Sequence, residues 1–406
     1  MRLLFLNLLK TSAVQKVIFF TSLFFLLISV SGRALTLSEQ TDLSILTCGP
    51  GEMIHAIYGH TAIRVKDPLQ GLDMVFNYGV FSFSKPNFVY RFAKGQTDYM
   101  LAAERYRDFY ENYVARERSV YEQVLDLDLA DKQRLWDFLV ENAKPENREY
   151  RYNFFMDNCA TRVRDVIKNQ LGERVEFPEE GDNKTFREHI NHYQRVLPWT
   201  DFGIDLALGR PADQTATAWQ EMFLPDYLMK HFGDARMKTP EGDRPLVKET
   251  HPLFEAARQP ESVRILTPFN VFALALVLIV VLSVAGYRKK KSWYMIDYLW
   301  LFFTGFAGIA VLFLSQWSEH PAVRSNYNFL WAVPFNFLFL FAWTKQRWRG
   351  VLLWYWPALS LWMVLFLIFG AFLPQQFHPA AYLIAVMVLC RSLLHTFQLY
   401  GKNKQD

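Results

Sequence analysis

The chain has 406 residues and a formal net charge of +4, with 51% hydrophobic and 21% charged residues, and this length favours two or three domains. The charge is uneven, because residues 266–406 carry 11 Lys and Arg against 3 Asp and Glu, whereas residues 31–265 have a net charge of −7. A polar, acidic part joined to a basic, very apolar one excludes a simple cytosolic globular protein. Nucleic-acid binding is also disfavoured, because the basic residues lie beside apolar runs and not on a polar face.

The N-terminal segment is typical of an exported protein. Arg2, Lys10 and Lys16 precede an apolar run over residues 17–30, which has about the length of a signal peptide, and small residues that could allow cleavage follow it. An uncleaved membrane anchor is the alternative. Both interpretations place residues 35–265 outside the cytoplasmic membrane.

A β-hairpin is predicted early in the exported part. Residues 43–47 form a short apolar strand that ends in a Cys-Gly-Pro-Gly turn, residues 61–65 alternate like a half-buried strand, and residues 74–78 are the returning strand. His60 then stands at the entrance of the hairpin and Asn77 on its returning strand. Three further elements are expected in this part: one or two helical turns over 52–58, a strand over 119–127 and an amphipathic helix over 131–142.

A helix is predicted to begin near Cys159. Apolar residues recur at helical spacing from Val163 to Leu171, and Asp157 or Asn158 could serve as the N-cap. A thiol in the first turn of a helix lies in the positive field of the helix dipole and beside free N–H groups. This environment lowers the pKa of the thiol and favours the thiolate, which is the nucleophile.

The stretch after this helix holds fewer signals. His189 and His192 have the i, i+3 spacing of a metal-binding pair, but no carboxylate or Cys cluster completes a site, so we expect no metal and no other cofactor. Residues 199–210 and 223–232 have amphipathic patterns that could lie on a bilayer surface.

Five apolar segments follow. A hydrocarbon core of about 30 Å needs about 20 apolar residues of helix, and the C-terminal region supplies this at 267–287, 298–317, 325–344, 351–373 and 380–400. The fifth contains Arg391 and His395, which suggest function inside a membrane, although Arg391 could equally extend to the cytoplasmic surface. Basic residues follow the first, third and fifth segments, which places those loops in the cytoplasm. The chain thus divides into 1–34, an exported domain over 35–265 and a membrane domain over 266–406.

The cysteines allow either a disulfide or a reactive thiol. Cys390 lies within the fifth membrane segment, so only Cys48 and Cys159 could pair outside the cytoplasm. A Cys nucleophile needs a base beside the thiol and a third group that orients the imidazole. His60, Asn77 and Cys159 occur in an order that could supply these groups, although the residue types alone are a weak signal.

Four motifs carry a resemblance to a known family: LTCGPG over 46–51, YGHTAIR over 58–64, FNYG over 76–79 and DNCATR over 157–162. With them, residues 38–200 resemble the N-terminal periplasmic domain of the bacterial Lnb-type lipoprotein N-acyltransferases, and the membrane part resembles that family in layout. The Lnb domain is similar to circularly permuted NlpC/P60 thiol enzymes, in which His precedes Cys. The implied fold is α+β, with a permuted NlpC/P60-like (papain-like) exported domain followed by a five-helix transmembrane domain.

The resemblance also implies roles for individual residues. Cys159 is the expected nucleophile and His60 the base, and Asn77 is the candidate for the orienting residue. Some relatives use a second His in that third position, and this sequence has none nearby.

Three more residues are candidates for substrate binding, each with a structural alternative. Tyr58 could donate to an oxyanion or simply pack as an aromatic ring. Arg162 could contact a phosphate headgroup or pair with Asp157. Cys48 could line the site or pack in its turn.

The expected function is that of a lipoprotein N-acyltransferase. It would move an acyl chain from phospholipid, through a Cys thioester, to the α-amine of the lipidated N-terminal cysteine of a lipoprotein. The expected partners are phospholipid, diacylglyceryl lipoproteins and the lipid bilayer, and the expected location is the bacterial inner membrane with a periplasmic catalytic domain. The alternatives are a membrane-anchored NlpC/P60-type cysteine hydrolase acting on peptidoglycan peptides or lipid, and a non-enzymatic sensor or scaffold.

Overall fold

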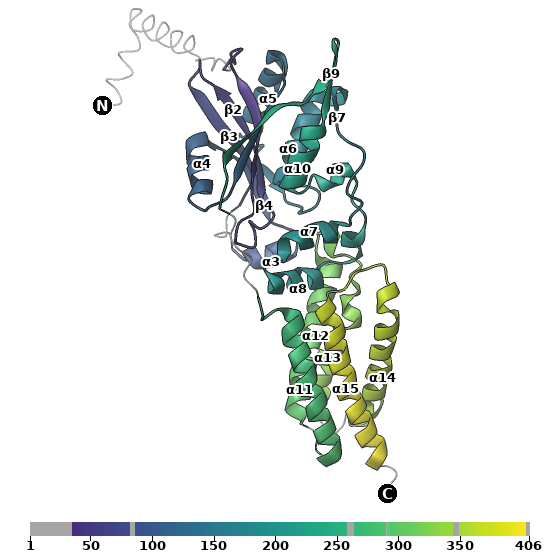
Figure 1. Cartoon of the computed structure of the whole chain (residues 1–406). Coiled ribbons are helices and arrows are strands. Elements are labelled where there is room, and N and C mark those ends of the chain that lie inside the picture. The colour runs from purple at the N-terminus through teal and green to yellow at the C-terminus, as the bar shows by residue number, and fades with distance from the viewer. Residues whose placement is uncertain are drawn as a thin grey trace, which may run out of the picture.

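A computed structural model describes residues 35–81, 86–257, 264–289, 291, 293–343 and 349–402. The expected signal peptide or anchor over 1–34 lies outside these residues. An α+β domain and a helical domain are stacked end to end, with the C-terminus at the far end of the helical one (Figure 1). The expected fold class, an α+β domain followed by a domain of membrane-type helices, is confirmed.

A seven-stranded sheet forms the centre of the α+β domain. Its strands lie in the order β10-β5-β1-β2-β3-β4-β6, and every neighbouring pair is antiparallel. The bounds are β1 Asp42–Cys48, β2 His60–Asp67, β3 Leu72–Val80, β4 Asp98–Arg105, β5 Val120–Leu125, β6 Glu149–Arg151 and β10 Val247–Phe254. The predicted hairpin is β2 and β3, in which Ile63 lies opposite Phe76.

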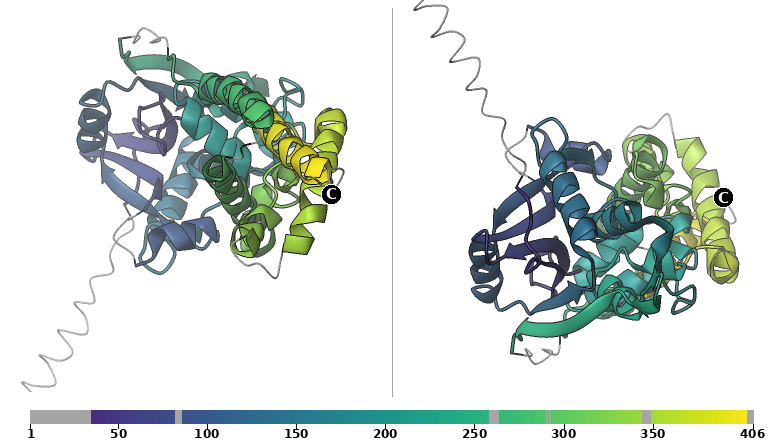
Figure 2. Two further views of the ribbon diagram at one scale, coloured as in Figure 1. Left: turned by 90° about the horizontal axis from the view of Figure 1, so that it is seen from below. Right: turned by 90° about the horizontal axis from the view of Figure 1, so that it is seen from above.

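Helices cover both faces of this sheet (Figure 2). On one face α4 (Tyr106–Val114) buries Phe109 against β-strand residues. On the other face the larger core contains side chains of α5 (Leu129–Asn142), α6 (Cys159–Leu171) and α10 (Pro225–Asp234). Because both faces are covered, β1 is buried from its second residue to its last.

The remaining elements of this domain are short. They are α3 Phe88–Ala93, η1 Gly172–Arg174, β7 Val175–Glu176, α7 Phe186–Gln194, α8 Pro198–Ala207, η2 Arg210–Asp213, α9 Ala218–Glu221, β8 Arg236–Thr239 and β9 Gly242–Pro245. Strands β7, β8 and β9 form a second sheet. Of the two amphipathic segments, 199–210 largely forms α8, whereas 223–232 packs in the domain core as α10 and does not lie on a bilayer surface.

The helical turns expected over residues 52–58 are not present. The chain there makes successive i to i+3 turns, with Ala56 N–H donating to Met53 O and Gly59 N–H to Ala56 O. Gly59 has φ of +82°, a conformation that favours glycine, and the segment folds back so that Gly51 N–H donates to Ala56 O. This tight return brings His60 opposite Cys48 on the neighbouring strand.

Four helices in the described part of the chain are long and apolar enough to cross a membrane. They are α11 Pro268–Lys289, α12 Tyr294–Trp317, α14 Arg349–Phe369 and α15 Pro379–Lys402. The third predicted segment begins differently from the expectation, because its first part contains the turn η4 (Tyr327–Leu330). Its helix, α13 (Phe335–Trp343), is described only as far as Trp343.

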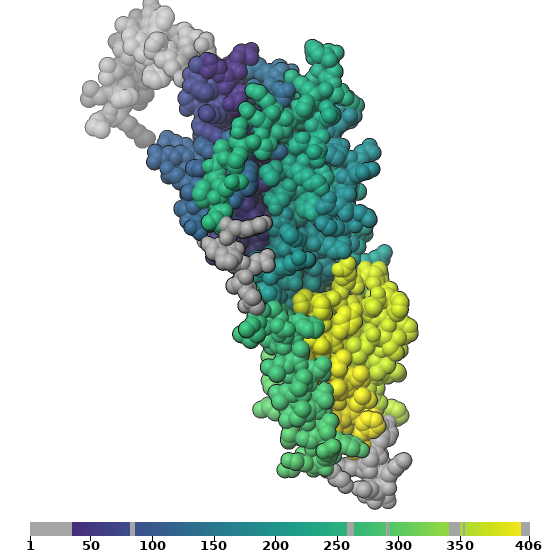
Figure 3. Space-filling view, in the orientation of Figure 1, coloured from purple at the N-terminus to yellow at the C-terminus, as the bar shows by residue number. Residues whose placement is uncertain are grey.

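Polar residues explain why the first part of the third segment does not continue as a membrane helix. Asn326 Nδ2 donates to the carbonyls of Leu206 and Ala207, and Asn328 Nδ2 donates to those of Asp205 and Leu206, at the end of α8. These side chains therefore bind the exported domain to the membrane domain. The two domains consequently form one continuous body (Figure 3).

Three ionisable side chains meet inside the membrane domain. Arg391 Nε and Nη2 lie 2.6 and 2.8 Å from the carboxylate of Asp297, and His395 Nε2 lies 2.8 Å from the same carboxylate. All three residues are buried. The Arg391 side chain therefore pairs within the helix bundle and does not extend to the cytoplasmic surface.

Candidate active site

Cys159 is the first residue of α6. Asn158 is the N-cap, and its Oδ1 accepts hydrogen bonds from the N–H groups of Ala160 and Thr161, both at 2.9 Å. Thr161 Oγ1 accepts in return from Asn158 N–H at 2.7 Å, which completes a capping box. The cap holds the half-buried thiol at the helix start, as the sequence predicted.

His60 is oriented by Asn77. His60 Nε2 and Asn77 Oδ1 are 2.6 Å apart, and Asn77 Nδ2 donates to Glu104 Oε1 at 3.0 Å. Because Glu104 receives the amide N–H, Asn77 presents its oxygen to the ring, and Nε2 must carry the proton of that hydrogen bond. Nδ1 is then the nitrogen that can exchange a proton with a thiol.

Gly79 lies beside both members of the Cys–His pair. It has φ of +92°, and a Cβ at this position would lie 3.4 Å from Cys159 Cβ and 3.8 Å from His60 Cε1. Any larger residue would therefore meet the backbone strain of this conformation, and its Cβ would be in van der Waals contact with Cys159.

The electrostatics favour a thiolate–imidazolium pair. Burial raises the pKa of the Cys159 thiol, but the charge of His60, its hydrogen bond and the N–H groups of Thr61 and Ala160 outweigh burial, so the pKa lies below its ordinary value. Burial lowers the pKa of His60, but Cys159 and the hydrogen bond to Asn77 outweigh it, and that pKa lies above its ordinary value. The opposite shifts share one contribution, since each charged form stabilises the other.

Sequence reasoning missed the residues behind this pair. Glu104 comes from β4, and the Tyr113 ring of α4 stacks on His60 with centroids 6.3 Å apart. The guanidinium carbon of Arg118 lies 4.6 Å from the Tyr113 ring centroid, and Arg118 Nε donates to Gly49 O. Glu104 directly follows a run of apolar residues, Tyr99–Ala103, and this carboxylate was a weak local signal, whereas no local signal existed for Tyr113.

The three predicted substrate-binding residues have structural partners. Cys48 is fully buried, and burial raises the pKa of its thiol, so this cysteine lies beside the site in an unreactive form. Tyr58 OH accepts from Gln194 at 2.6 Å, and its ring packs 4.7 Å from that of Phe154. Both contacts correspond to the packed alternatives.

Arg162 likewise forms the alternative contact. It makes a bidentate ion pair with Asp157 and lies 4.0 Å from the centroid of the Tyr150 ring. The two possible N-caps therefore have different roles: Asn158 caps the helix, and Asp157 forms the ion pair with Arg162.

Metal-binding geometry is not found at His189 and His192. His189 is buried and faces Glu221, with 3.4 Å between Nε2 and Oε1. Over the described ranges, no group of three or more His, Cys, Asp or Glu residues is arranged to hold a metal ion.

Comparison with known proteins gives matches for both domains. Residues 35–192 match the family model described as the Lnb N-terminal periplasmic domain, and residues 259–403 match the one described as the Lnb transmembrane domain. No curated protein and no solved structure matches the chain. The two family matches cover most of the chain and follow the two domains of the structure, so this is a membrane protein with a periplasmic domain. The chain therefore belongs to the Lnb-type lipoprotein N-acyltransferases.

Proposed function

We propose that this protein transfers an acyl chain from phospholipid to the α-amine of a lipoprotein's lipidated N-terminal cysteine, through a thioester on Cys159. The observation that carries the proposal is the arrangement of three residues, in which Cys159 lies beside His60 and His60 is hydrogen-bonded to Asn77. The helix start favours the thiolate, and the 2.6 Å contact of His60 with Asn77 fixes the imidazole. These are the three functions that a cysteine nucleophile needs.

In the first half-reaction Cys159 is acylated. The thiol proton passes to His60 Nδ1, and the thiolate attacks the ester carbonyl of the phospholipid. As the tetrahedral intermediate collapses, the C–O bond breaks, and His60 returns the proton to the leaving lysophospholipid oxygen. The N–H groups of Thr61 and Ala160, which lower the pKa of the Cys159 thiol, stabilise the negative charge on sulfur before attack.

In the second half-reaction the acyl group leaves Cys159. The α-amine of the lipoprotein attacks the thioester carbonyl and loses a proton to His60. The C–S bond breaks, an amide forms and Cys159 is regenerated as a thiolate paired with the imidazolium. A covalent intermediate lets two bulky lipids use one site in turn.

The location of the site supports lipid substrates. β3 leads from Asn77 toward α3, and Ala93 O at the end of α3 accepts a hydrogen bond from Ser318 Oγ, just beyond α12. β2 is antiparallel to β3, so His60 at its start lies at the same, membrane-facing end of the sheet. A catalytic domain held at the bilayer raises the effective concentration of substrates that are themselves confined there.

The basic residues support a multi-pass topology in the bacterial inner membrane, with the catalytic domain in the periplasm. Arg288 and Lys289 end α11, and Lys402 ends α15. Both helix ends lie away from the α+β domain (Figure 1). Positive charge at the far ends is the pattern expected on the cytoplasmic side.

Mass spectrometry of the purified protein in nanodiscs tests this proposal. With phospholipid alone, we expect an acyl adduct on Cys159 that neutral hydroxylamine removes, and no adduct on Cys159→Ala. A lipopeptide with a free α-amine should discharge the adduct and become N-acylated. Release of free fatty acid or cleavage of a wall peptide, with no effect of lipopeptide, would favour the hydrolase instead.

A further inference from the structure

An apolar cavity of about 540 Å³ lies where the two domains meet. Trp199, Phe202 and Leu206 of α8 line it from the exported domain, and residues that include Phe272 of α11 and Ala307 of α12 line it from the membrane domain. The volume falls in the range of small-molecule binding sites. The lining is almost entirely carbon, so the cavity offers nothing to a polar ligand.

Helix α8 is built to cover this cavity. Trp199, Phe202 and Leu206 follow the i, i+3, i+7 spacing of one helix face. Asp205 is directed elsewhere and pairs with Arg187 at 2.6 Å. Trp199 Nε1 donates to Leu266 O at 2.9 Å, just before α11, which ties the start of α8 to the start of that helix.

The cavity lies within the thickness of the bilayer. Along α12 its lining runs from Ala307 to Ile296, which are ten and 21 residues before Trp317, the outer end of that helix. These separations correspond to about 15 and about 32 Å of helix, against a hydrocarbon core of about 30 Å. Three of the lining side chains face outward from the protein, since Trp199, Leu299 and Phe303 are 48%, 52% and 60% exposed. The opening is therefore lateral, toward lipid.

We propose that this cavity binds an acyl chain of a membrane phospholipid. At this depth no water is available to fill an apolar hollow, and an alkyl chain entering from the side matches its lining. Phospholipid is the occupant favoured by mass action, because it is the bulk component of the leaflet. Binding of a lipoprotein acyl chain in its place is an outcome that the test can detect.

This inference deepens the proposed function and rests on it in one respect, namely that the bound phospholipid is the acyl donor. Helix α8, which belongs to the domain that carries Cys159, covers one side of the cavity, and the cavity opens to the bilayer. One donor chain held there would keep the ester near the membrane-facing end of the sheet.

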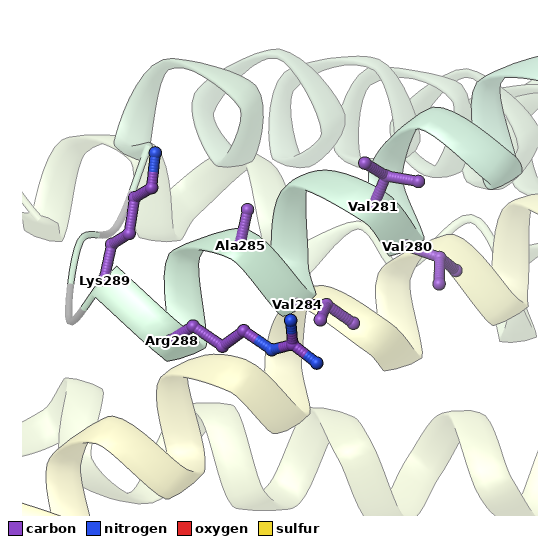
Figure 4. A pocket seen from close by; sticks show the side chains of 6 residues that line it. All are labelled: Val280, Val281, Val284, Ala285, Arg288 and Lys289. Carbon is purple, nitrogen blue, oxygen red and sulfur yellow. The ribbon is translucent and has the colours of Figure 1, made fainter.

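A second hollow, of about 440 Å³, makes a useful contrast. Its lining residues run from Val280 to Lys289 and all belong to α11 (Figure 4). A surface formed by one helix alone does not enclose a ligand. The proposed site differs because two domains and several helices contribute to it.

Ala307→Trp is the direct test, because it fills the cavity from one wall. Ile309→Trp is the matched control, since Ile309 lies on the same helix, is 39% exposed and does not line the cavity. Leu206→Trp fills the cavity from α8 and is a second test if Ala307→Trp fails to fold. Alkylation of Cys159 by a small soluble reagent checks that the exported domain is intact in each variant.

Photocrosslinking in nanodiscs measures occupancy. The probe is phosphatidylethanolamine with a diazirine on one acyl chain, and a diacylglyceryl lipopeptide with the same diazirine is the second arm. We expect phospholipid adducts on α8 and on residues 296–307. Displacement of about five chain carbons should reduce the labelling of Ala307→Trp about tenfold and leave that of Ile309→Trp unchanged. Equal labelling of the three proteins, or capture of the lipopeptide alone, would overturn the proposal.

The kinetics of acyl-Cys159 formation give an independent readout. Ala307→Trp should react about tenfold more slowly with long-chain phospholipid and at an unchanged rate with the dihexanoyl analogue, which is too short to fill the cavity. An equal loss with both donors would contradict the inference. If the wild type forms no acyl-Cys159, the proposed function fails, and crosslinking still decides whether the cavity binds lipid.

Discussion

Replacement of Asn77 by Ala should weaken the Cys159–His60 pair without removing either member. Asn77 Oδ1 is 2.6 Å from His60 Nε2 and accepts a hydrogen bond from the N–H that the imidazolium presents. A hydrogen bond to a charged group contributes about 1.5–3 kcal/mol. Loss of that contribution destabilises the imidazolium, which in turn stabilises the thiolate. We expect acyl-Cys159 formation to slow about ten- to hundredfold.

The pH dependence gives the direction of the effect. In the wild type the pKa of His60 is raised and that of Cys159 is lowered, so the thiolate persists below the ordinary thiol pKa of about 8.5. Without Asn77 the pKa of His60 falls and the pKa of Cys159 rises. The reactivity of Cys159 should therefore drop near neutral pH and recover as the pH is raised.

Alkylation by iodoacetamide across this pH range measures the thiolate directly, with mass spectrometry to separate Cys159 from the buried Cys48. Asn142→Ala is the matched control, because Asn142 accepts a hydrogen bond from Tyr78 OH within the same domain but outside the Cys–His pair. A wild-type pH profile in Asn77→Ala would refute the reasoning. An identical change in Asn142→Ala would show that the effect is a general loss of structure.

Three further predictions concern other parts of the structure. Cys159→Ala should abolish acyl transfer with the fold intact, whereas Cys48→Ala should retain activity, and lipopeptide N-acylation together with circular dichroism checks both. Gly79→Ala should lose activity and about 1 kcal/mol or more of stability, because its φ is +92°; a denaturant titration beside the activity assay measures this. Asp297→Ala should cost about 3–5 kcal/mol by leaving Arg391 buried without its carboxylate. Thermal unfolding in detergent tests that loss, and the addition of Arg391→Met should recover part of it.

Local patterns determined where the candidate nucleophile and base would lie. Alternation predicted the hairpin of β2 and β3, which places His60 and Asn77 near one end of the sheet. Helical spacing and the available cap predicted the start of α6 at Cys159. These signals are reliable because capping and alternation depend on residues only a few positions apart.

The sequence could not show what surrounds this pair. Glu104 reaches Asn77 from β4, and Tyr113 reaches His60 from α4, through contacts between residues distant in the chain. β10 is far from its partner strand β5 in the sequence. Its residues are mostly exposed and do not alternate in polarity. Long-range pairing of this kind leaves no local periodicity to detect.

The membrane part shows the same division. Uninterrupted apolar length determined four helices of spanning length among the described residues, because the bilayer imposes that length directly. Only the tertiary structure decided that Asn326 and Asn328 bind the end of α8, and that Arg391 pairs with Asp297 within the bundle. The cavity beneath α8 likewise forms only where the two domains, which are separate in the sequence, pack against each other. Burial and hydrogen-bond partners are properties of the assembled chain, so the sequence supplied the reactive groups and the tertiary structure supplied their surroundings.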